Sequence, residues 1–402
     1  MSEATYLVGD VFDRMAAMPD GSVDLVLTSP PFLALRSYLP ADHPDKAKEI
    51  GSEPTPAEFL DTLLRLTAEW GRLLAPHGSI AVELGDTYAS SGGITDNRDD
   101  SLGGKDFAPR GRRGNGPGWP LDKSMCGIPH LYHLSLAYGR NLLTGEESPA
   151  GMWRVRNVVA WCRPNPPVGA LGDKYRPATS YITIATRARD RWFDLDAVRN
   201  QASGPVRNRL VGEASASKGV SGGDIGNPDK ERASHNPAGS PPLDWWEVPT
   251  EPYSGSHYAT WPRKLLGRPI ESMCPREVCA ACGEPRRRIV EAEYVTADGN
   301  RVSGRSAFGR GGASDGTAAP DGGDNRATRQ STTLGWSNCG CGAPFRTGIV
   351  LDPFAGSGTT LAVATGLGRD AIGIDLDERN ADLARERVGM FLTVVAAGEV
   401  AA

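Results

Sequence analysis

Long apolar runs are missing from this 402-residue sequence, and its opening residues lack the features expected of a leader that directs a chain across a membrane. No stretch reaches eighteen apolar residues, and the opening MSEATYLVGD lacks the basic and apolar regions of a secretory signal. The apolar patch at 390–397 is too short to span a bilayer. With 39% hydrophobic and 23% charged residues, the composition predicts a water-soluble globular protein, which we expect to be cytoplasmic.

An excess of positive charge is also missing. The formal net charge is −5, which disfavours a surface that is basic throughout. Binding to a polyanion needs only local positive charge, however, because each phosphate contact is local. Two clusters qualify, Arg110 with Arg112 and Arg113, and Arg286–Arg288, with a solvated surface as the alternative for each.

Cysteine is too sparse for a disulfide scaffold, with seven in the chain. Four of them form two close pairs, Cys279 with Cys282 and Cys339 with Cys341, and a glycine follows each pair. Four thiolates in this pattern predict a closed, structural zinc site, and the glycines permit tight turns. Only one residue separates the second pair, so Cys274 is an alternative ligand, and four separate buried cysteines are the alternative to a metal.

The remaining cysteines and two of the six histidines suggest no further chemistry. Cys126 and Cys162 are expected in the core. His130 and His133 stand three apart on a predicted helix with no carboxylate or cysteine beside them, so packing is favoured over metal binding.

Hydrophobic patterning predicts α/β structure at both ends of the chain. Strands are expected at 5–8, 23–28, 79–84, 349–352 and 371–374, and helices at 11–18, 55–74, 359–366 and 378–390. Between them, helices near 128–136 and from 262 and strands near 155–161 and 181–186 are expected. These pieces predict one doubly wound sheet assembled from both chain ends, with insertions between them. The Gly- and Ser-rich stretches 89–118, 204–242 and about 298–335 predict flexible loops.

The segment IVLDPFAGSGTT, residues 349–360, ends a strand at Asp352 and begins a helix at Thr359. Glycines in such a turn let a ligand approach the backbone, and the N–H groups at the helix start bind carboxylate or phosphate. Asp375 ends the next strand about 20 residues later, where the ribose diol of a nucleoside cofactor is held. The pattern indicates a nucleoside cofactor, with a ligand-free turn as the alternative.

A second segment, DLVLTSPPF, delivers Ser29, Pro30, Pro31 and Phe32 to the carboxyl edge of the sheet. The two prolines fix the backbone, so that the Ser29 hydroxyl and the Pro30 carbonyl are rigid acceptors. Phe32 offers a flat apolar face on which a base can stack. For these four residues alone, a proline-stiffened turn with a core phenylalanine is the alternative.

The sequences SPPF at 29–32 and DPFAGSGTT at 352–360 resemble the catalytic and cofactor motifs of amino-group DNA methyltransferases. The catalytic motif comes first, as in the permuted β group of that family. Three further segments resemble family segments in the family's order: Gly9-Asp10, the strand 155–161 with RPNP after it, and HYATWP at 257–262. The sequence departs from the family at Tyr181 and Ile182, where a His-Glu pair is usual, in the long loop after 86–88, and in the insertion at 139–151.

The resemblance implies a Rossmann-like methyltransferase sheet that binds S-adenosylmethionine and flips a base out of double-stranded DNA. It implies catalytic roles for Ser29, Pro30, Pro31 and Phe32. The residues implied for the cofactor are Asp10, Asp352, Pro353, Phe354, Gly356, Gly358, Thr359 and Asp375. A second copy of the chain and a cognate restriction nuclease are considered as further partners, and a membrane is not.

The resemblance also implies the target atom, because serine before the Pro-Pro pair usually accompanies N4 of cytosine, whereas Asp or Asn accompanies N6 of adenine. The Ser29 hydroxyl can accept from the amine and donate to ring N3, which an ionised Asp cannot do. N6 of adenine is the runner-up, and methylation of a protein or RNA amine is less favoured. C5 of cytosine is disfavoured because no cysteine flanks the prolines. The alternative from another class is a non-catalytic DNA-binding module.

On this interpretation the chain divides into five parts. They are a catalytic half at 1–88, a mobile loop and target-recognition region at 89–250, a cofactor-pocket segment at 251–273, a zinc-ribbon-like insertion at 274–347 and a cofactor-binding half at 348–402.

Overall fold

The computed structural model describes residues 2–35, 38–40, 42–89, 116–166, 173–200, 239–251, 261–295, 301–302 and 328–399. Contacts divide the chain into two units. Unit 1 comprises Met1–Asp194, Leu243–Arg286 and Cys339–Ala402, and unit 2 comprises Leu195–Pro242 and Arg287–Asn338. Several predictions fall outside the described residues: most of the three predicted loops, the cluster of Arg110, Arg112 and Arg113, and residues 257–260. No helix in the described ranges is long and apolar enough to cross a membrane.

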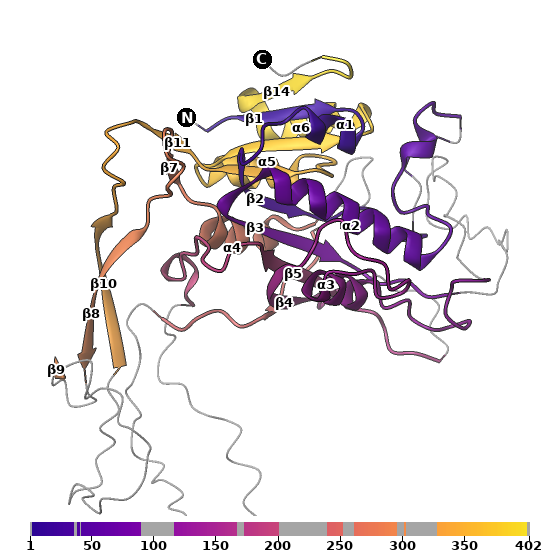
Figure 1. The fold of residues 1–402 in the computed structure, drawn as a ribbon, viewed down its shortest axis with the longest axis horizontal. Helices are drawn as coiled ribbons and strands as arrows, with labels where there is room; N and C mark the ends of the chain where they lie inside the picture. The colour runs from indigo at the N-terminus through magenta and orange to yellow at the C-terminus, as the bar shows by residue number, and fades with distance from the viewer. Residues whose placement is uncertain are drawn as a thin grey trace, which may run out of the picture. The chain divides into compact units, whose positions relative to one another are not determined.

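A nine-stranded sheet forms the centre of unit 1 (Figure 1). Its strands in spatial order are β14 (Leu392–Val395), β1 (Ala4–Val8), β13 (Asp370–Asp375), β12 (Ile349–Asp352), β2 (Val23–Thr28), β3 (Leu74–Leu84), β5 (Thr179–Thr186), β4 (Arg154–Cys162) and β6 (Trp245–Glu247). Neighbours from β14 to β3 are parallel, whereas β5 is antiparallel to both β3 and β4. Since β12 pairs with β2 and β13 pairs with β1, the predicted single sheet assembled from both chain ends is confirmed.

Helices cover both faces of this sheet. One apolar core lies between the sheet and α1 (Val11–Ala16), α2 (Pro56–Leu73) and α3 (Ile128–Tyr138). A second core lies between the opposite face and α4 (Arg263–Met273), α5 (Thr359–Gly366) and α6 (Arg379–Val388). Short 3-10 helices occupy Lys46–Lys48, Asp196–Val198 and Gly389–Phe391. The buried strands read as unbroken apolar runs because both of their faces are covered.

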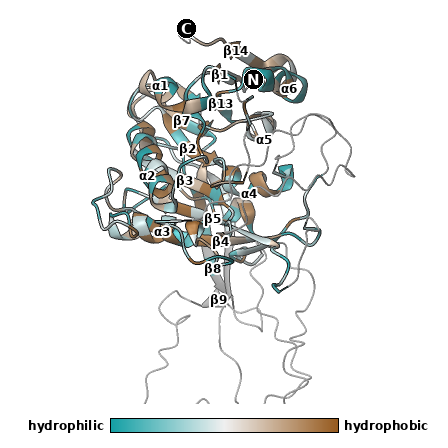
Figure 2. Ribbon diagram, turned by 90° about the vertical axis from the view of Figure 1, so that its right-hand side faces the viewer, coloured by the Kyte–Doolittle hydropathy of each residue, from teal (hydrophilic) through white to brown (hydrophobic). Residues whose placement is uncertain are grey.

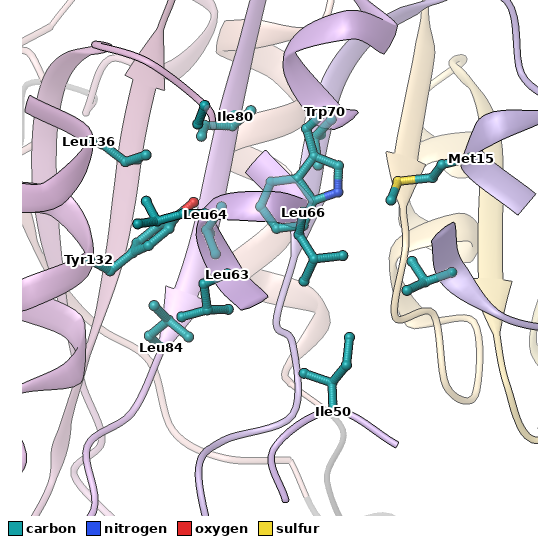
Figure 3. Packing of buried hydrophobic residues seen from close by; sticks show 14 of the residues in the cluster. Met15, Ile50, Leu63, Leu64, Leu66, Trp70, Ile80, Leu84, Tyr132 and Leu136 are labelled. Atoms are coloured by element: carbon teal, nitrogen blue, oxygen red, sulfur yellow. The ribbon is translucent and has the colours of Figure 1, made fainter. Parts of the chain in front are cut away.

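The longest helix, α2, shows how the sequence encodes this packing. Thr55 caps it by accepting a hydrogen bond from the Glu58 N–H, and Pro56 occupies its first turn. Its apolar residues recur at helical spacing, so one face is buried while the other carries polar groups (Figure 2). Leu63, Leu66 and other fully buried side chains of α2 pack with residues of α1, α3 and β3 (Figure 3). Burial of each such leucine contributes about 1.5–3 kcal/mol.

Two smaller sheets were not predicted. In unit 2, β10 (Thr328–Trp336) pairs antiparallel with β8 (Arg288–Val295), which also pairs with β9 (Arg301–Val302). The prediction of a flexible loop is therefore wrong for 328–335, where threonines suited to a strand find a partner in β8. In unit 1, β7 (Glu277–Cys279) pairs with β11 (Phe345–Thr347). Strands β7 and β11 are too short for a periodic pattern in the sequence to reveal them.

Candidate active site

The SPPF segment lies at the carboxyl edge of the parallel strands, directly after β2. That strand is buried along its full length and ends at Thr28. Ser29 and Phe32 are half-buried and Pro30 is buried. Because Thr28 pairs with Val82 of β3, the segment lies beside the last residues of β3. The sheet therefore brings a neighbouring strand's side chains to the predicted catalytic residues.

Glu83 is the side chain that β3 contributes, and sequence reasoning missed it. The Ser29 hydroxyl donates a hydrogen bond of 2.6 Å to Glu83 Oε2. Glu83 is only 2% exposed. Burial raises the pKa of this carboxyl, although hydrogen bonds from Ser180 and Ser29 and the charge of Arg163 oppose that shift. The only signal in the sequence is a glutamate inside an apolar strand, AVEL, where an unpaired charge is costly.

The Phe32 ring lies against a glycine at the end of β3. A Cβ placed on Gly85 would be 2.5 Å from Phe32 Cε2. The present position of the Phe32 ring therefore requires glycine at residue 85. A Cβ on Gly51, whose φ is +94°, would be 2.9 Å from the Phe32 carbonyl oxygen. Ala34 N–H donates to the Gly51 carbonyl at 2.7 Å. Two close backbone approaches thus hold the segment and its aromatic ring in place.

Strands β4 and β5 bring a cation to the same edge. The Arg163 guanidinium lies 5.0 Å from the ring centroid of Trp161 and donates from Nη1 to Ser180 Oγ at 3.2 Å. Burial lowers the pKa of Arg163, and the charge of Glu83 opposes that shift. Arg163 belongs to the family-like segment that follows β4, and its neighbour Asn165 exchanges two hydrogen bonds with the Thr250 backbone.

The glycine-rich turn connects β12 to α5 as predicted, and one of its glycines lies close to α6. Gly358 has φ +74°, and a Cβ there would lie 2.9 Å from Ala384 Cβ of α6. A side chain at Gly358 would therefore disturb the packing of α5 against α6. Thr359 is buried and its hydroxyl accepts a hydrogen bond from Arg387. Pro353, Gly356 and Gly358 are buried, and Phe354 is half-exposed.

Asp352 lies beneath both motifs and links them. Its Oδ1 accepts hydrogen bonds from Thr28 Oγ1 at 2.7 Å and from the Phe354 N–H at 3.2 Å. Its Oδ2 accepts a hydrogen bond from the Thr360 hydroxyl. The carboxyl is 2% exposed, and burial raises its pKa to about 6, although the two threonine hydroxyls oppose that shift. One side chain thus fixes the residue before Ser29 to the first turn of α5.

Asp375 holds the glycine turn from the end of β13. Its Oδ2 accepts a hydrogen bond from the Gly356 N–H at 2.8 Å, and its Oδ1 accepts from Asn380 Nδ2 at 3.0 Å. Burial raises its pKa to about 6, with these hydrogen bonds in opposition. From β1, the buried Tyr6 hydroxyl donates to the Gly356 carbonyl at 2.7 Å, so Gly356 is fixed on both sides. Tyr6 gave no signal in the sequence beyond its apolar strand.

Asp10 lies beside Asp375 because β1 and β13 are parallel neighbours and the Gly9 N–H donates to the Asp375 carbonyl at 2.8 Å. Its Oδ1 caps α1 by accepting from the N–H groups of Phe12 and Asp13. In the turn between β12 and α5, Ser357 Oγ is buried without a hydrogen-bond partner among the residues that the structure covers.

The four predicted zinc ligands come together in unit 1. One ligand atom each from Cys279, Cys282, Cys339 and Cys341 lies within 4.8 Å of the others, the only such group of histidines, cysteines or carboxylates within the described ranges. Cys274 is not a member and lies fully buried in the core beside α4. The ligands are held close because β7, which ends at Cys279, pairs with β11 just after the second pair. Gly283, Gly340 and Gly342 adopt left-handed conformations that these tight turns require.

Other predicted residues take structural positions. Cys126 is buried, Cys162 is half-buried, and the His130 ring packs at 5.6 Å from His133 and at 4.8 Å from Tyr181. Arg286 forms an ion pair of 2.8 Å with Glu277.

Known proteins resemble this chain over most of its length. The N6/N4 methyltransferase family, described as DNA methylase, matches residues 23–278 and 344–386. The Type II methyltransferase M.SmaI of Serratia marcescens is 23% identical over 384 residues, covering 95% of this chain and 89% of that protein. The Type II methyltransferase M.Cfr9I of Citrobacter freundii is 25% identical over 324 residues, covering 76% of this chain and 89% of that protein. The structure of the PvuII DNA methyltransferase (cytosine-N4-specific) is 12% identical, with a TM-score of 0.48 and coverage of 100% of this chain and 97% of that chain. Since the family model matches well over half of the sequence, the chain belongs to the N6/N4 DNA methylase family.

Proposed function

We propose that the chain methylates the exocyclic amino group of a flipped base in double-stranded DNA, with N4 of cytosine as the target and S-adenosylmethionine as the methyl donor. The observation that carries the proposal is the hydrogen bond from Ser29 to the buried Glu83. An exocyclic amine is a poor nucleophile because its lone pair is delocalised into the ring. Rigid acceptors on the amine N–H groups localise that lone pair for attack.

Ser29 and Pro30 supply two such acceptors. The single hydroxyl proton of Ser29 is donated to Glu83, so the Ser29 oxygen is left to accept from the amine. This use of the proton replaces the donation to ring N3 that sequence reasoning considered. The Pro30 carbonyl is the second acceptor, and Phe32, held against Gly85, offers its free face for stacking with the base.

Glu83 also provides a destination for the proton that the amine must lose. As the new N–C bond forms, the nitrogen carries one proton too many. That proton moves to Ser29 Oγ while the hydroxyl proton of Ser29 moves to Glu83, which leaves Ser29 neutral and Glu83 protonated. The raised pKa of the buried Glu83 favours its protonated form.

The residues around the glycine turn fit a nucleoside cofactor. S-adenosylmethionine, when bound, supplies the electrophilic methyl group. Asp375 would hold the ribose diol and Asp10 would lie near the adenine, while Phe354 and the turn at Gly356 would contact the rest. The buried Ser357 hydroxyl, which has no partner among the described residues, is a polar group suited to such a ligand. Asp352 would act indirectly, because its carboxyl is only 2% exposed and is engaged by Thr28, Thr360 and the Phe354 N–H, whereas Asp375 is half-exposed.

Analysis of the modified base tests the proposal. Purified protein is incubated with unmethylated double-stranded DNA and labelled S-adenosylmethionine, and the DNA is digested to nucleosides for mass spectrometry. We expect N4-methylcytosine. N6-methyladenine without N4-methylcytosine would replace the target atom, and no labelled base would support the non-catalytic alternative.

The names of the relatives favour a role in restriction-modification. M.SmaI and M.Cfr9I are Type II methyltransferases, so we propose sequence-specific methylation that protects DNA from a cognate nuclease. The order of the motifs, catalytic at 29–32 and cofactor at 352–360, supports the permuted β group.

We also propose that Cys279, Cys282, Cys339 and Cys341 hold one structural zinc ion. Four thiolates within 4.8 Å of one another match a tetrahedral zinc site, and four protein ligands leave no position for catalysis. Metal analysis of protein purified without chelator should give one zinc per chain. Cys282→Ser should abolish zinc binding and weaken DNA binding, because metal binding and local folding are coupled. The control Cys162→Ser should retain zinc, and zinc-free wild-type protein would refute the site.

A further inference from the structure

An exposed tyrosine lies on the chain that leads into β5. Tyr175 is 97% exposed, the highest value among the exposed large apolar side chains of the described residues. It stands between two cations, Lys174 and Arg176, and residues 173–177 are all exposed. A single exposed aromatic residue is common, so its surroundings must show whether this one has a role.

The place of the segment in the sheet is the first indication. Strand β5 is antiparallel to β3, and Tyr181 pairs with Leu84 near the end of β3. The residues before β5 therefore emerge at the carboxyl edge that carries Ser29 and Glu83. Six residues span at most about 20 Å, which limits how far Tyr175 lies from that pairing. The Arg163 N–H donates to the Ala178 carbonyl at 2.8 Å and ties the segment to the same edge.

The second indication is that contacts hold the segment before the tyrosine, at Asp173 and Lys174, and after it, at Ala178, while the tyrosine ring is exposed. Asp173 forms an ion pair of 3.0 Å with Lys123. The Lys174 ammonium lies 3.6 Å from the ring centroid of Tyr88, which itself forms a β-bridge with Met125. Asp173 and Lys174 thus contact the rest of unit 1, yet the large ring of Tyr175 is not buried. Because the backbone on either side is already held and a tyrosine side chain has only two rotatable χ angles, ordering the Tyr175 ring on a binding partner costs little conformational entropy.

We propose that Tyr175 inserts into the base stack of duplex DNA next to the target nucleotide and fills the space that the flipped base leaves. This inference rests on the proposed function, since only an enzyme that flips a base creates that space. Inserted aromatic or apolar side chains replace lost stacking between bases, and stacking on an aromatic ring tolerates any base. The flanking charges of Lys174 and Arg176 suit the phosphates on either side.

The test compares Tyr175→Ala and Tyr175→Phe with a control, Tyr138→Ala, which removes a 63% exposed tyrosine at the end of α3. Each protein is assayed on a duplex that carries a methylation site mapped with the wild type, and on the same duplex with a mismatch opposite the target base. A mismatched base is already partly unstacked, so a residue that aids flipping matters less there. We expect Tyr175→Ala to lower kcat/KM about 10- to 100-fold on the matched duplex and about threefold or less on the mismatched one. Tyr175→Phe and Tyr138→Ala should remain close to the wild type on both.

A second readout separates this inference from the proposed function. A duplex with 2-aminopurine beside the target base is mixed with the protein without S-adenosylmethionine, and its fluorescence is measured while no methyl transfer occurs. The wild type should raise the fluorescence by disturbing the stack, and Tyr175→Ala should not. Equal losses on matched and mismatched DNA, or an unchanged fluorescence response in Tyr175→Ala, would overturn the insertion of Tyr175 while wild-type methylation stands. Wild-type protein that methylates no base but still raises the fluorescence in a Tyr175-dependent way would instead refute the proposed function alone.

Discussion

Replacing Gly85 with alanine should move the Phe32 ring and slow methyl transfer. The added Cβ would be 2.5 Å from Cε2, 3.0 Å from Cδ2 and 3.2 Å from Cζ of Phe32. Carbon atoms in van der Waals contact lie about 3.5–4.0 Å apart, so the ring must shift by about 1 Å. Overpacking of this size costs about 1–3 kcal/mol. Because Phe32 is half-exposed, the ring can give way toward the side proposed for the base, and the main loss should appear in catalysis.

A double-mutant cycle shows whether the effect passes through Phe32. Gly85→Ala, Phe32→Ala and the double variant are compared for thermal stability, S-adenosylmethionine affinity and kcat on DNA. We expect Gly85→Ala to lower kcat about 10- to 100-fold with cofactor affinity unchanged, since each 1.4 kcal/mol is a factor of ten. In the Phe32→Ala background the same change should have little effect on stability or rate, because the clash is gone. The control Gly366→Ala, which meets nothing within 4 Å, should behave as wild type. Additive losses in the double variant would refute the contact as the cause.

Three further substitutions test the site. Ser29→Ala removes the acceptor that Glu83 polarises and should cost about 2–4 kcal/mol of transition-state stabilisation. We expect kcat to fall about 30- to 1000-fold with little change in KM for DNA, and a wild-type rate would contradict this role. Asp375→Ala removes the acceptor for the Gly356 N–H and a proposed ribose contact. Calorimetry should show that affinity for S-adenosylmethionine falls at least tenfold, and an unchanged affinity would contradict the ribose contact. Asp352→Asn tests the cost of the buried charge. The pKa of Asp352 in the folded protein is about 6, above its ordinary value of 3.8. Ionisation of Asp352 therefore lowers the free energy of unfolding by about 3 kcal/mol in total as pH rises from about 4 to 6. Denaturant unfolding should therefore show Asp352→Asn gaining stability relative to the wild type between pH 4 and pH 7.5, and a pH-independent difference would argue against this cost.

Much of the architecture could be predicted from local sequence patterns. The apolar runs that form β2 and β12 and the spacing of apolar residues in α2 depend on residues near one another in the chain. The two motif segments and the paired cysteines were equally local, and the cysteines do come together. The short strands β6, β7 and β11 gave no usable pattern, and β10 was hidden in a stretch whose composition favoured a loop.

The contacts inside the site were decided by tertiary structure. Glu83 is one acidic residue in a strand until the pairing of β2 with β3 places it against Ser29. Thr28 and Asp352 are 324 residues apart in sequence, and only the adjacency of β2 and β12 joins them. A side chain at Gly358 would meet Ala384, and no local pattern in the glycine-rich turn reveals that α6 lies there. The physical reason is common to all three: sequence patterns report the conformation of a segment and which of its faces is apolar, but a hydrogen bond or a steric limit depends on which distant strand or helix lies beside it.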